Sequence, residues 1–203
     1  KELFSEIYYK YLNIEYFKEK IGYIDEFHNN FYYGKLGNED EIRRHLFLSL
    51  RKKNLWPINK YIESYKEDDL FDIIEFCYDN ISQPIYEEVS DDYLGQRYEV
   101  DHYIYDEPKS EFRDAINKHL KDYGEGFELL KTGNIVILSG YGLESIYEAK
   151  IPSNDDQNII KPINIAIDKF RGKISTLQDR KEAVRLLADV LEYLRPKAKF
   201  VIT

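Results

Sequence analysis

The chain has 203 residues, of which 43% are hydrophobic, so it can bury a core as one domain or as two small domains. The formal net charge of −9 argues against general binding to nucleic acid, which depends on clustered Lys and Arg. A single cysteine, Cys77, excludes an intramolecular disulfide and a multi-cysteine zinc site. With no apolar run of 18 residues and no signal peptide, we expect a cytoplasmic protein that does not enter a membrane. The chain contains no Met, which predicts that the natural protein begins upstream of residue 1.

The first 81 residues predict three helices separated by loops. Apolar side chains recur at helical spacing over 3–20, and a Gly- and Asn-containing loop follows at 28–38. Residues 39–53 have acids in the first turn and bases in the last, as the helix macrodipole favours, and Trp56-Pro57 ends this helix. The third helix covers 68–81, where an apolar stripe that includes the cysteine follows an acidic N-terminus.

The middle of the chain gives weaker signals. Residues 86–99 are acidic and predict an irregular segment. Alternating side chains over 100–105 predict a short strand that Pro108 ends. A helix is expected over 110–123, because Gly124 follows it directly and glycine commonly ends helices.

The last third of the chain contains the clearest patterns. Thr132-Gly133-Asn134 separates two apolar segments and predicts a β-hairpin over 127–138. A polar loop at 153–158 precedes a helix over 159–170. The final helix covers 179–194, with Asp179 as its N-cap, Glu182 completing a capping box, a buried apolar stripe, and Pro196 as its stop.

These elements together predict an α+β fold that is mostly α-helical, with a small antiparallel β-hairpin or three-stranded sheet. We divide the chain into an N-terminal helical segment over 1–60, an α+β domain over 61–175 and a C-terminal helix over 176–203.

Two groups of basic residues suggest contact with nucleic acid. Arg43, Arg44, Arg51 and Lys52 gather on the second predicted helix and could hold phosphates, although cations also belong in the last turn of any helix. Arg113 and His119 form an Arg-x5-His pair that looks like the catalytic motif of HEPN ribonucleases. On one helix, however, the two side chains are roughly 120° apart around the axis and about 9 Å apart along it. A ribonuclease site would therefore need a second subunit, and a packed histidine is the competing interpretation.

Other catalytic patterns are incomplete. Glu148-x-Lys150 resembles half of a metal-dependent nuclease motif, but neither Asp101 nor Asp122 supplies the further carboxylate where it is needed. Asp101 and His102 are neighbours on a predicted strand and are therefore expected on opposite faces. The histidines show no metal-ligand spacing, and no phosphate-binding glycine loop is present. We expect no metal, no cofactor and no catalysis by this chain alone.

Two blocks of the sequence carry a family resemblance. The first consists of FRDAINKHLKDYGEGFELLKTGNIVIL (112–138) with IIKPINIAIDKF (159–170), and the second is DRKEAVRLLADVLEYLRP (179–196). Their order of helix, Gly-containing turn at 123–127, hairpin and Lys161-Pro162 helix resembles the N-terminal domain of AbiJ-like abortive-infection proteins. In that family the domain precedes a HEPN ribonuclease domain, whose catalytic residues lie beyond a helix like 179–194.

The resemblance implies a sensing, regulatory or interaction module of a bacterial antiphage system that acts by binding a partner. The partner is expected to be a second copy of the chain or a separate or missing effector domain, and Leu187, Leu191 and Leu194 are the expected interface residues. The abundance of Tyr, 19 residues in all, is typical of an interface, but compositional bias from an AT-rich genome also explains it and is the favoured interpretation. Two alternatives remain at this point: a HEPN-type ribonuclease whose site is completed across a dimer, and an RNA- or DNA-binding module.

Overall fold

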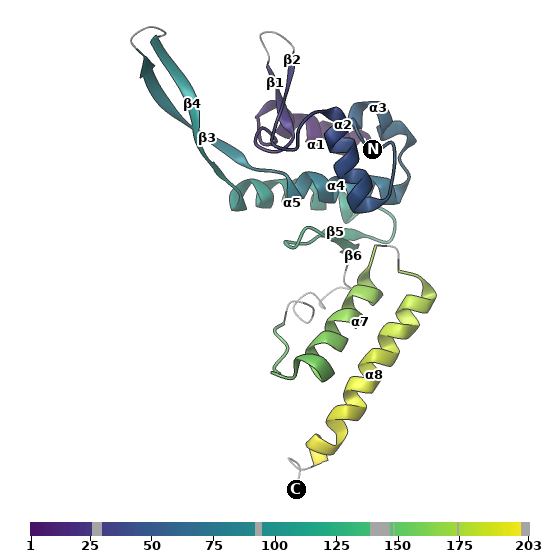
Figure 1. Ribbon diagram of the computed structural model, residues 1–203. Coiled ribbons are helices and arrows are strands. Elements are labelled where there is room, and N and C mark those ends of the chain that lie inside the picture. Colours follow the sequence, from purple (N-terminus) through teal and green to yellow (C-terminus); the bar gives the residue numbers. More distant parts are fainter. Residues whose placement is uncertain (26–29, 92–94, 139–146, 148, 174, 200–203) are drawn as a thin grey trace. The chain divides into compact units, whose positions relative to one another are not determined.

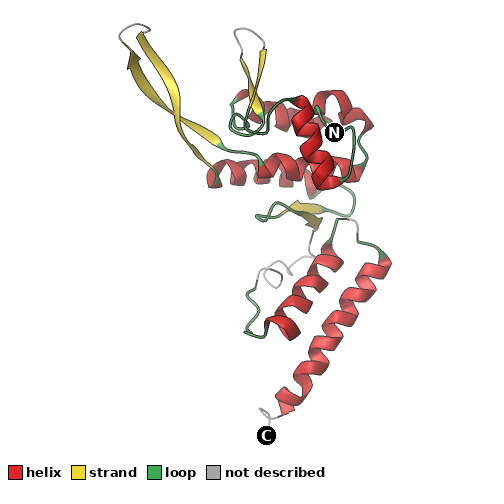
Figure 2. Ribbon diagram, in the orientation of Figure 1, coloured by secondary structure: helices red, strands yellow, loops and turns green. Residues whose placement is uncertain are grey.

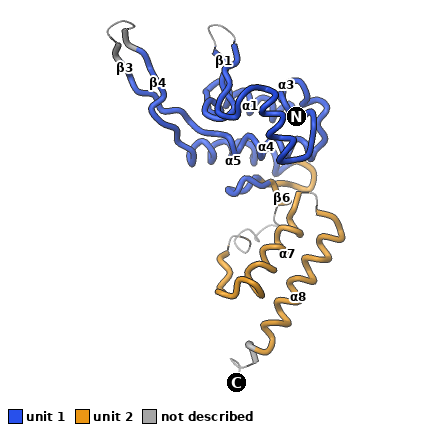
Figure 3. Tube along the Cα trace, in the orientation of Figure 1, with its two compact units in different colours: residues 1–122, 129–134 blue, residues 123–128, 135–203 orange. Residues whose placement is uncertain are grey.

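The computed structural model describes residues 1–25, 30–91, 95–138, 147, 149–173 and 175–199 (Figure 1). The described residues contain seven α-helices and three antiparallel sheets of two strands each, so the expected mostly helical α+β fold is confirmed (Figure 2). The chain forms two compact units, with residues 1–122 and 129–134 in unit 1 and residues 123–128 and 135–203 in unit 2 (Figure 3).

Unit 1 contains most of the secondary-structure elements. Unit 1 contains α1 (Glu2–Asn13), β1 (Gly22–Asp25), β2 (Asn30–Tyr33), α2 (Glu39–Leu50), α3 (Ile58–Tyr61), η1 (Ile62–Ser64), α4 (Glu67–Asp79), β3 (Gln83–Asp91), β4 (Gly95–Ile104) and α5 (Asp106–Leu120). The hairpin of β5 (Phe127–Leu129) and β6 (Ile135–Ile137) has residues in both units. Unit 2 continues with η2 (Asp156–Ile160), α7 (Lys161–Arg171) and α8 (Leu177–Lys199).

The core of unit 1 is an aromatic cluster between α1 and α5. Phe112 on α5 has no exposed surface, and its ring lies edge-on against Tyr11 at 5.3 Å and Phe17 at 6.3 Å. Cys77 on α4 is also fully buried, and burial raises the pKa of its thiol. The cysteine therefore acts as a small apolar core residue, as its place on the apolar stripe indicated.

Two of the predicted helices end earlier than expected, and for the same reason. α1 stops at Asn13 instead of residue 20, just before Glu15 adopts a φ of 62°. α2 stops at Leu50, and Arg51 follows it with a φ of 59° in the left-handed region. A single left-handed residue ends a helix, and apolar periodicity does not reveal it.

The predicted irregular segment over 86–99 was wrong. β3 and β4 pair over their whole length as an antiparallel ribbon, with Glu87 directly opposite Glu99. Like charges directly opposite each other weaken a strand pair. The acidic composition of 86–99 therefore gave no indication of two paired strands. Pro108 does not end β4 either, because it lies in the first turn of α5, where a proline costs no intrahelical hydrogen bond.

Two polar clusters attach the β3–β4 ribbon to the turn that follows α1. At one of them, Lys18 donates to Glu15 at 3.0 Å and to the Tyr86 hydroxyl at 2.7 Å, and Tyr86 belongs to β3. At the other, the buried carboxylate of Glu19 accepts hydrogen bonds from Lys35 at 2.8 Å and from Tyr105, just after β4, at 3.1 Å. The start of β3 and the end of β4 are thus each bound to the same short segment.

The hairpin over 127–138 is confirmed, with β5 and β6 flanking a turn in which Gly133 has a φ of 93°. The Asn117 side chain on α5 accepts a hydrogen bond from the Leu129 amide at 2.6 Å and donates one to the Leu129 carbonyl at 3.0 Å. This pair of bonds satisfies both backbone groups of Leu129, so the side chain of Asn117 holds this residue of β5 to α5.

The final helix is confirmed but its ends were misplaced. α8 begins at Leu177, and the box is formed by Thr176 and Asp179: the Asp179 amide donates to Thr176 Oγ1 at 3.1 Å and the Thr176 amide donates to Asp179 Oδ2 at 3.0 Å. Asp179 therefore occupies the third helical position, not the cap. Glu182 instead accepts from Lys169 on α7 at 2.8 Å, and Pro196 lies inside α8 instead of ending it.

Lys52 provides a test of how the end of α2 is held to α4. Its ammonium contacts Asp68, Asp69 at 3.2 Å and Asp72 at 2.6 Å. Burial by itself lowers the pKa of Lys52, but the three carboxylates outweigh it and raise that pKa. We expect Lys52→Met to lower the free energy of unfolding by about 1–3 kcal/mol, because the acids of α4 lose their shared cation. The exposed neighbour gives the control: Lys53→Met should change the urea midpoint little, and equal effects of the two variants would contradict this account.

Glu19 predicts a specific dependence on pH. Burial by itself raises the pKa of this carboxyl, but the hydrogen bonds from Lys35 and Tyr105 outweigh it, so the pKa lies below its ordinary value. A lowered carboxyl pKa stabilises the fold above the unfolded-state value of about 4.3, and the stabilisation disappears as pH falls through the folded-state value. Glu19→Gln should therefore be less stable than wild type by about 1–2 kcal/mol at pH 7, with a gap that closes toward pH 3. Urea denaturation at both pH values measures this, and a gap that does not change with pH would rule it out.

Candidate interaction surface

The apolar residues of α8 form two adjacent faces, and only one of them is buried. Ala183 and Val190 are buried on the side where Glu182 binds Lys169 of α7. The prediction that the whole stripe is buried was wrong, since Leu187 is 41% exposed and Leu191 is 68% exposed. α7 is a single helix and covers only part of an apolar arc this wide.

The exposed apolar residues of α8 repeat at a regular spacing. Leu177, Val184 and Leu191 follow one another at intervals of seven residues and are 71%, 60% and 68% exposed. Leu187 lies three residues after Val184, so it falls within about 60° of Val184 and Leu191 around the helix axis. We call these four residues the outer face of α8. Leu194, the third predicted interface residue, is half-buried beside it.

The predicted basic cluster is brought together only in part. Arg43, Arg44 and Lys52 line one hollow of about 410 Å³ on unit 1, while Arg51 is exposed outside it. Two of these cations already have partners: Arg43 pairs with Glu39 and with Asp40 at 2.9 Å, and Lys52 pairs with the acids of α4. Neutralised cations attract phosphates weakly, so the geometry gives the nucleic-acid alternative little support.

Arg113 and His119 both lie on α5 but do not form a pair. Arg113 donates to the Ser110 hydroxyl at 3.0 Å and lies 3.8 Å from the carboxylate of Asp114. His119 is half-buried, next to the stripe of Phe112, Ile116 and Leu120 that enters the core. Their separation along one helix agrees with the expectation that a HEPN-type site would need residues from a second chain.

The expectation that Asp101 and His102 lie on opposite faces was wrong. His102 Nδ1 is 2.7 Å from Asp101 Oδ2, although both side chains are about half exposed. The register explains it: Ile85 pairs with His102 and Tyr86 with Val100, so Asp101 is an extra residue in a β-bulge. A bulge breaks the alternation of side chains, which a sequence pattern of period two assumes.

The remaining candidates form no metal site in the part of the chain that the structure describes. No group of three or more His, Cys, Asp and Glu side chains there is placed to hold a metal ion. Lys150 is exposed, and Glu148 lies outside the described residues. None of the described helices combines the length and the apolar character that crossing a bilayer requires.

Comparison with models of protein families, with curated proteins and with solved structures found no match in any of the three. Because four apolar side chains are exposed along it, the outer face of α8 is the candidate interaction surface.

A cleavage assay tests the ribonuclease alternative. Because Arg113 and His119 do not meet within one chain, we expect the purified protein to leave single-stranded and structured RNA intact, with or without Mg²⁺. RNA cleavage that His119→Ala abolishes while the circular dichroism spectrum stays unchanged would contradict this expectation. The matched control is Lys118→Ala, which replaces the exposed basic side chain next to His119 on α5.

Proposed function

We propose that this chain is an interaction module that associates with a second copy of itself through the outer face of α8, and that it serves as a sensing or regulatory part of a bacterial antiphage system. The observation that carries the association is the exposure of Leu177, Val184, Leu187 and Leu191 along one side of a single helix. The AbiJ-like resemblance of 112–138, 159–170 and 179–196 supports the antiphage setting.

The energetic argument concerns apolar area. Burying a Leu side chain contributes about 1.5–3 kcal/mol, so a helix that leaves several of them in water forgoes a stabilisation comparable to that of a small domain. Contiguous exposed apolar side chains on a folded unit typically mark a surface that binds another protein. The polar side of α8, with Lys181, Arg185 and Glu192, shows that the helix is not apolar all round.

The spacing favours a second copy as the occupant. Apolar residues at intervals of seven, with another three positions on, are the pattern of helices that pack along a seam. Such a seam is complementary to itself, because two-fold symmetry brings the same patch of each copy into contact. In an α8–α8 contact the outer faces cover each other, and the buried face of each helix stays on its own α7.

Sedimentation velocity over a range of micromolar concentrations tests the association. We expect the wild-type chain to form dimers and Leu191→Asp to weaken the dimer at least tenfold, because a carboxylate would be desolvated in an apolar contact. Arg185→Asp on the polar side of α8 introduces the same side chain and should leave the dimer unchanged. A wild-type chain that remains monomeric, or equal weakening by both variants, contradicts the proposal.

The antiphage setting needs a separate experiment. In the native host, Leu191→Asp should let phages plate more efficiently than the wild type does, while Arg185→Asp should behave like wild type. If phages plate equally on strains carrying wild type, Leu191→Asp and Arg185→Asp, while the wild-type chain is a dimer in solution, the antiphage role is contradicted and the association is not.

A further inference from the structure

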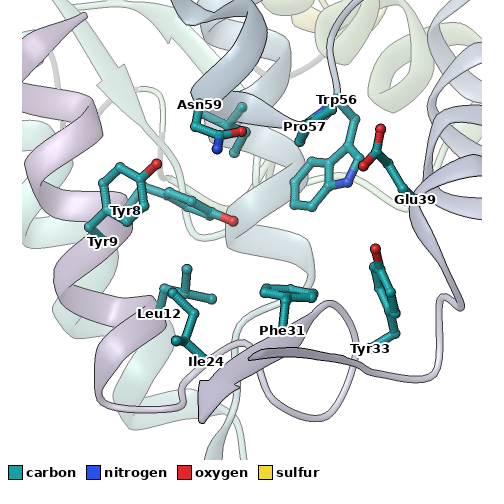
Figure 4. Close-up of a pocket in the computed structure, with 11 residues that line it drawn as sticks. Tyr8, Tyr9, Leu12, Ile24, Phe31, Tyr33, Glu39, Trp56, Pro57 and Asn59 are labelled. Carbon is teal, nitrogen blue, oxygen red and sulfur yellow. The ribbon is translucent and has the colours of Figure 1, made fainter. Parts of the chain in front are cut away.

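Unit 1 contains an aromatic hollow between α1, β2 and the segment that joins α2 to α3. Its volume is about 230 Å³, and the side chains of separate segments face the same space (Figure 4). The lining residues are Tyr8, Tyr9, Leu12, Ile24, Phe31, Tyr33, Glu39, Trp56, Pro57, Ile58 and Asn59. At this size the hollow suits a small head group better than a drug-sized molecule.

The walls consist of two edge-to-face aromatic pairs. Phe31 and Tyr33 on β2 have ring centroids 5.1 Å apart at 66°, and Tyr8 and Tyr9 on α1 have centroids 5.4 Å apart at 65°. Rings at steep angles to one another turn their faces in different directions, so the four rings do not present one flat wall. Trp56 adds a further aromatic wall.

Trp56 is fixed before any ligand arrives. Its side chain is buried, its ring lies edge-on to Phe76 at 6.1 Å, and its carbonyl accepts a hydrogen bond from Arg43 Nε at 3.1 Å. The preceding carbonyl, that of Leu55, accepts a hydrogen bond from the buried Tyr65 hydroxyl. A preformed wall loses little entropy when a ligand binds.

The charge at the edge of the hollow is negative. Glu39 is the one ionisable acid or base among the described lining residues other than the tyrosines, and Arg43 contacts its Oε1. Asp40 shares the same guanidinium, and Glu41 is a third acid in this first turn of α2. Glu39 and Asp40 together exceed the single positive charge of Arg43 by one unit, and the helix N-terminus offsets about half a unit of that, so the charge beside the hollow is slightly negative and favours a cation.

We propose that the aromatic hollow binds a small organic cation of the quaternary or methylated ammonium class. Aromatic faces attract a cation within about 6 Å of the ring centroid, and several such faces around one cation form the cage that recognises methylated ammonium groups. Methyl groups on the nitrogen fit the apolar walls of Leu12, Ile24 and Ile58, while Glu39 at the edge balances the charge. This site is independent of the outer face of α8, which belongs to unit 2.

Trp56 is the sole tryptophan of the chain, so its fluorescence reports on the hollow directly. Choline is the probe, and 3,3-dimethylbutan-1-ol, which has the same shape with carbon in place of the charged nitrogen, is its neutral counterpart. At constant ionic strength we expect choline to change Trp56 fluorescence saturably, with a dissociation constant at least fivefold below that of the neutral alcohol. Saturation-transfer NMR on the choline methyl protons provides a second readout that does not depend on tryptophan.

Two adjacent tyrosines of β2 supply the matched variants. Tyr33 lines the hollow and is 49% exposed, whereas Tyr32 is 46% exposed and stacks on Tyr23 at 5.4 Å, outside the set of lining residues. Tyr33→Ala should weaken choline binding about fivefold and Tyr32→Ala should not, since each truncates a half-exposed ring of the same kind. Glu39→Gln should weaken choline but not the neutral alcohol. The proposal is overturned if the alcohol binds as well as choline, if both tyrosine variants behave alike, or if neither readout detects choline at 50 mM, about fifty times a millimolar dissociation constant.

Discussion

The arrangement of unit 1 depends on the packing of one fully buried ring, that of Phe112. By packing edge-on against Tyr11 and Phe17 it joins α5 to α1 and to the turn that follows α1. Each of these elements then positions something else. α5 carries Asn117, which binds Leu129 of β5, and the turn after α1 carries the charged residues that hold the end of the ribbon where β3 begins and β4 ends. α1 itself presents Tyr8 and Tyr9 to the aromatic hollow.

The parts of the fold that were predictable from sequence are those in which local chemistry decides the outcome. Gly133 in a turn between apolar segments predicted the β5–β6 hairpin, and the acid-to-apolar order of 68–81 predicted α4 within two residues. Several errors arise where one residue overrides a periodic pattern. Glu15 and Arg51 end helices through left-handed conformations, and Asp101 forms a bulge that reverses which side chains share a face.

The candidate surfaces divide in the same way. Periodicity identified the apolar residues of α8, but it could not separate those that α7 covers from Leu187 and Leu191, because that depends on a neighbouring helix. The basic cluster illustrates the converse case, since the acids that neutralise Lys52 are 16 or more residues away along the chain. The aromatic hollow was not predicted from the sequence. Its lining residues lie between positions 8 and 59 of the chain. Two neighbouring tyrosines such as Tyr8 and Tyr9 do not predict a binding site, because the other lining residues join them only in the folded chain.

The β3–β4 ribbon has a consequence for how copies of this chain behave toward one another. Within the described residues β3 and β4 pair only with each other, so each has an outer edge of backbone donors and acceptors that another strand could extend. The exposed carboxylates of Glu87, Glu88 and Glu99 would lie beside their own equivalents if identical strands paired parallel and in register. Repulsion between like charges is greatest at low ionic strength and opposes such growth of a ribbon into a fibre. The same carboxylates that made these strands hard to predict from the sequence would thus oppose edge-to-edge association of the folded chain.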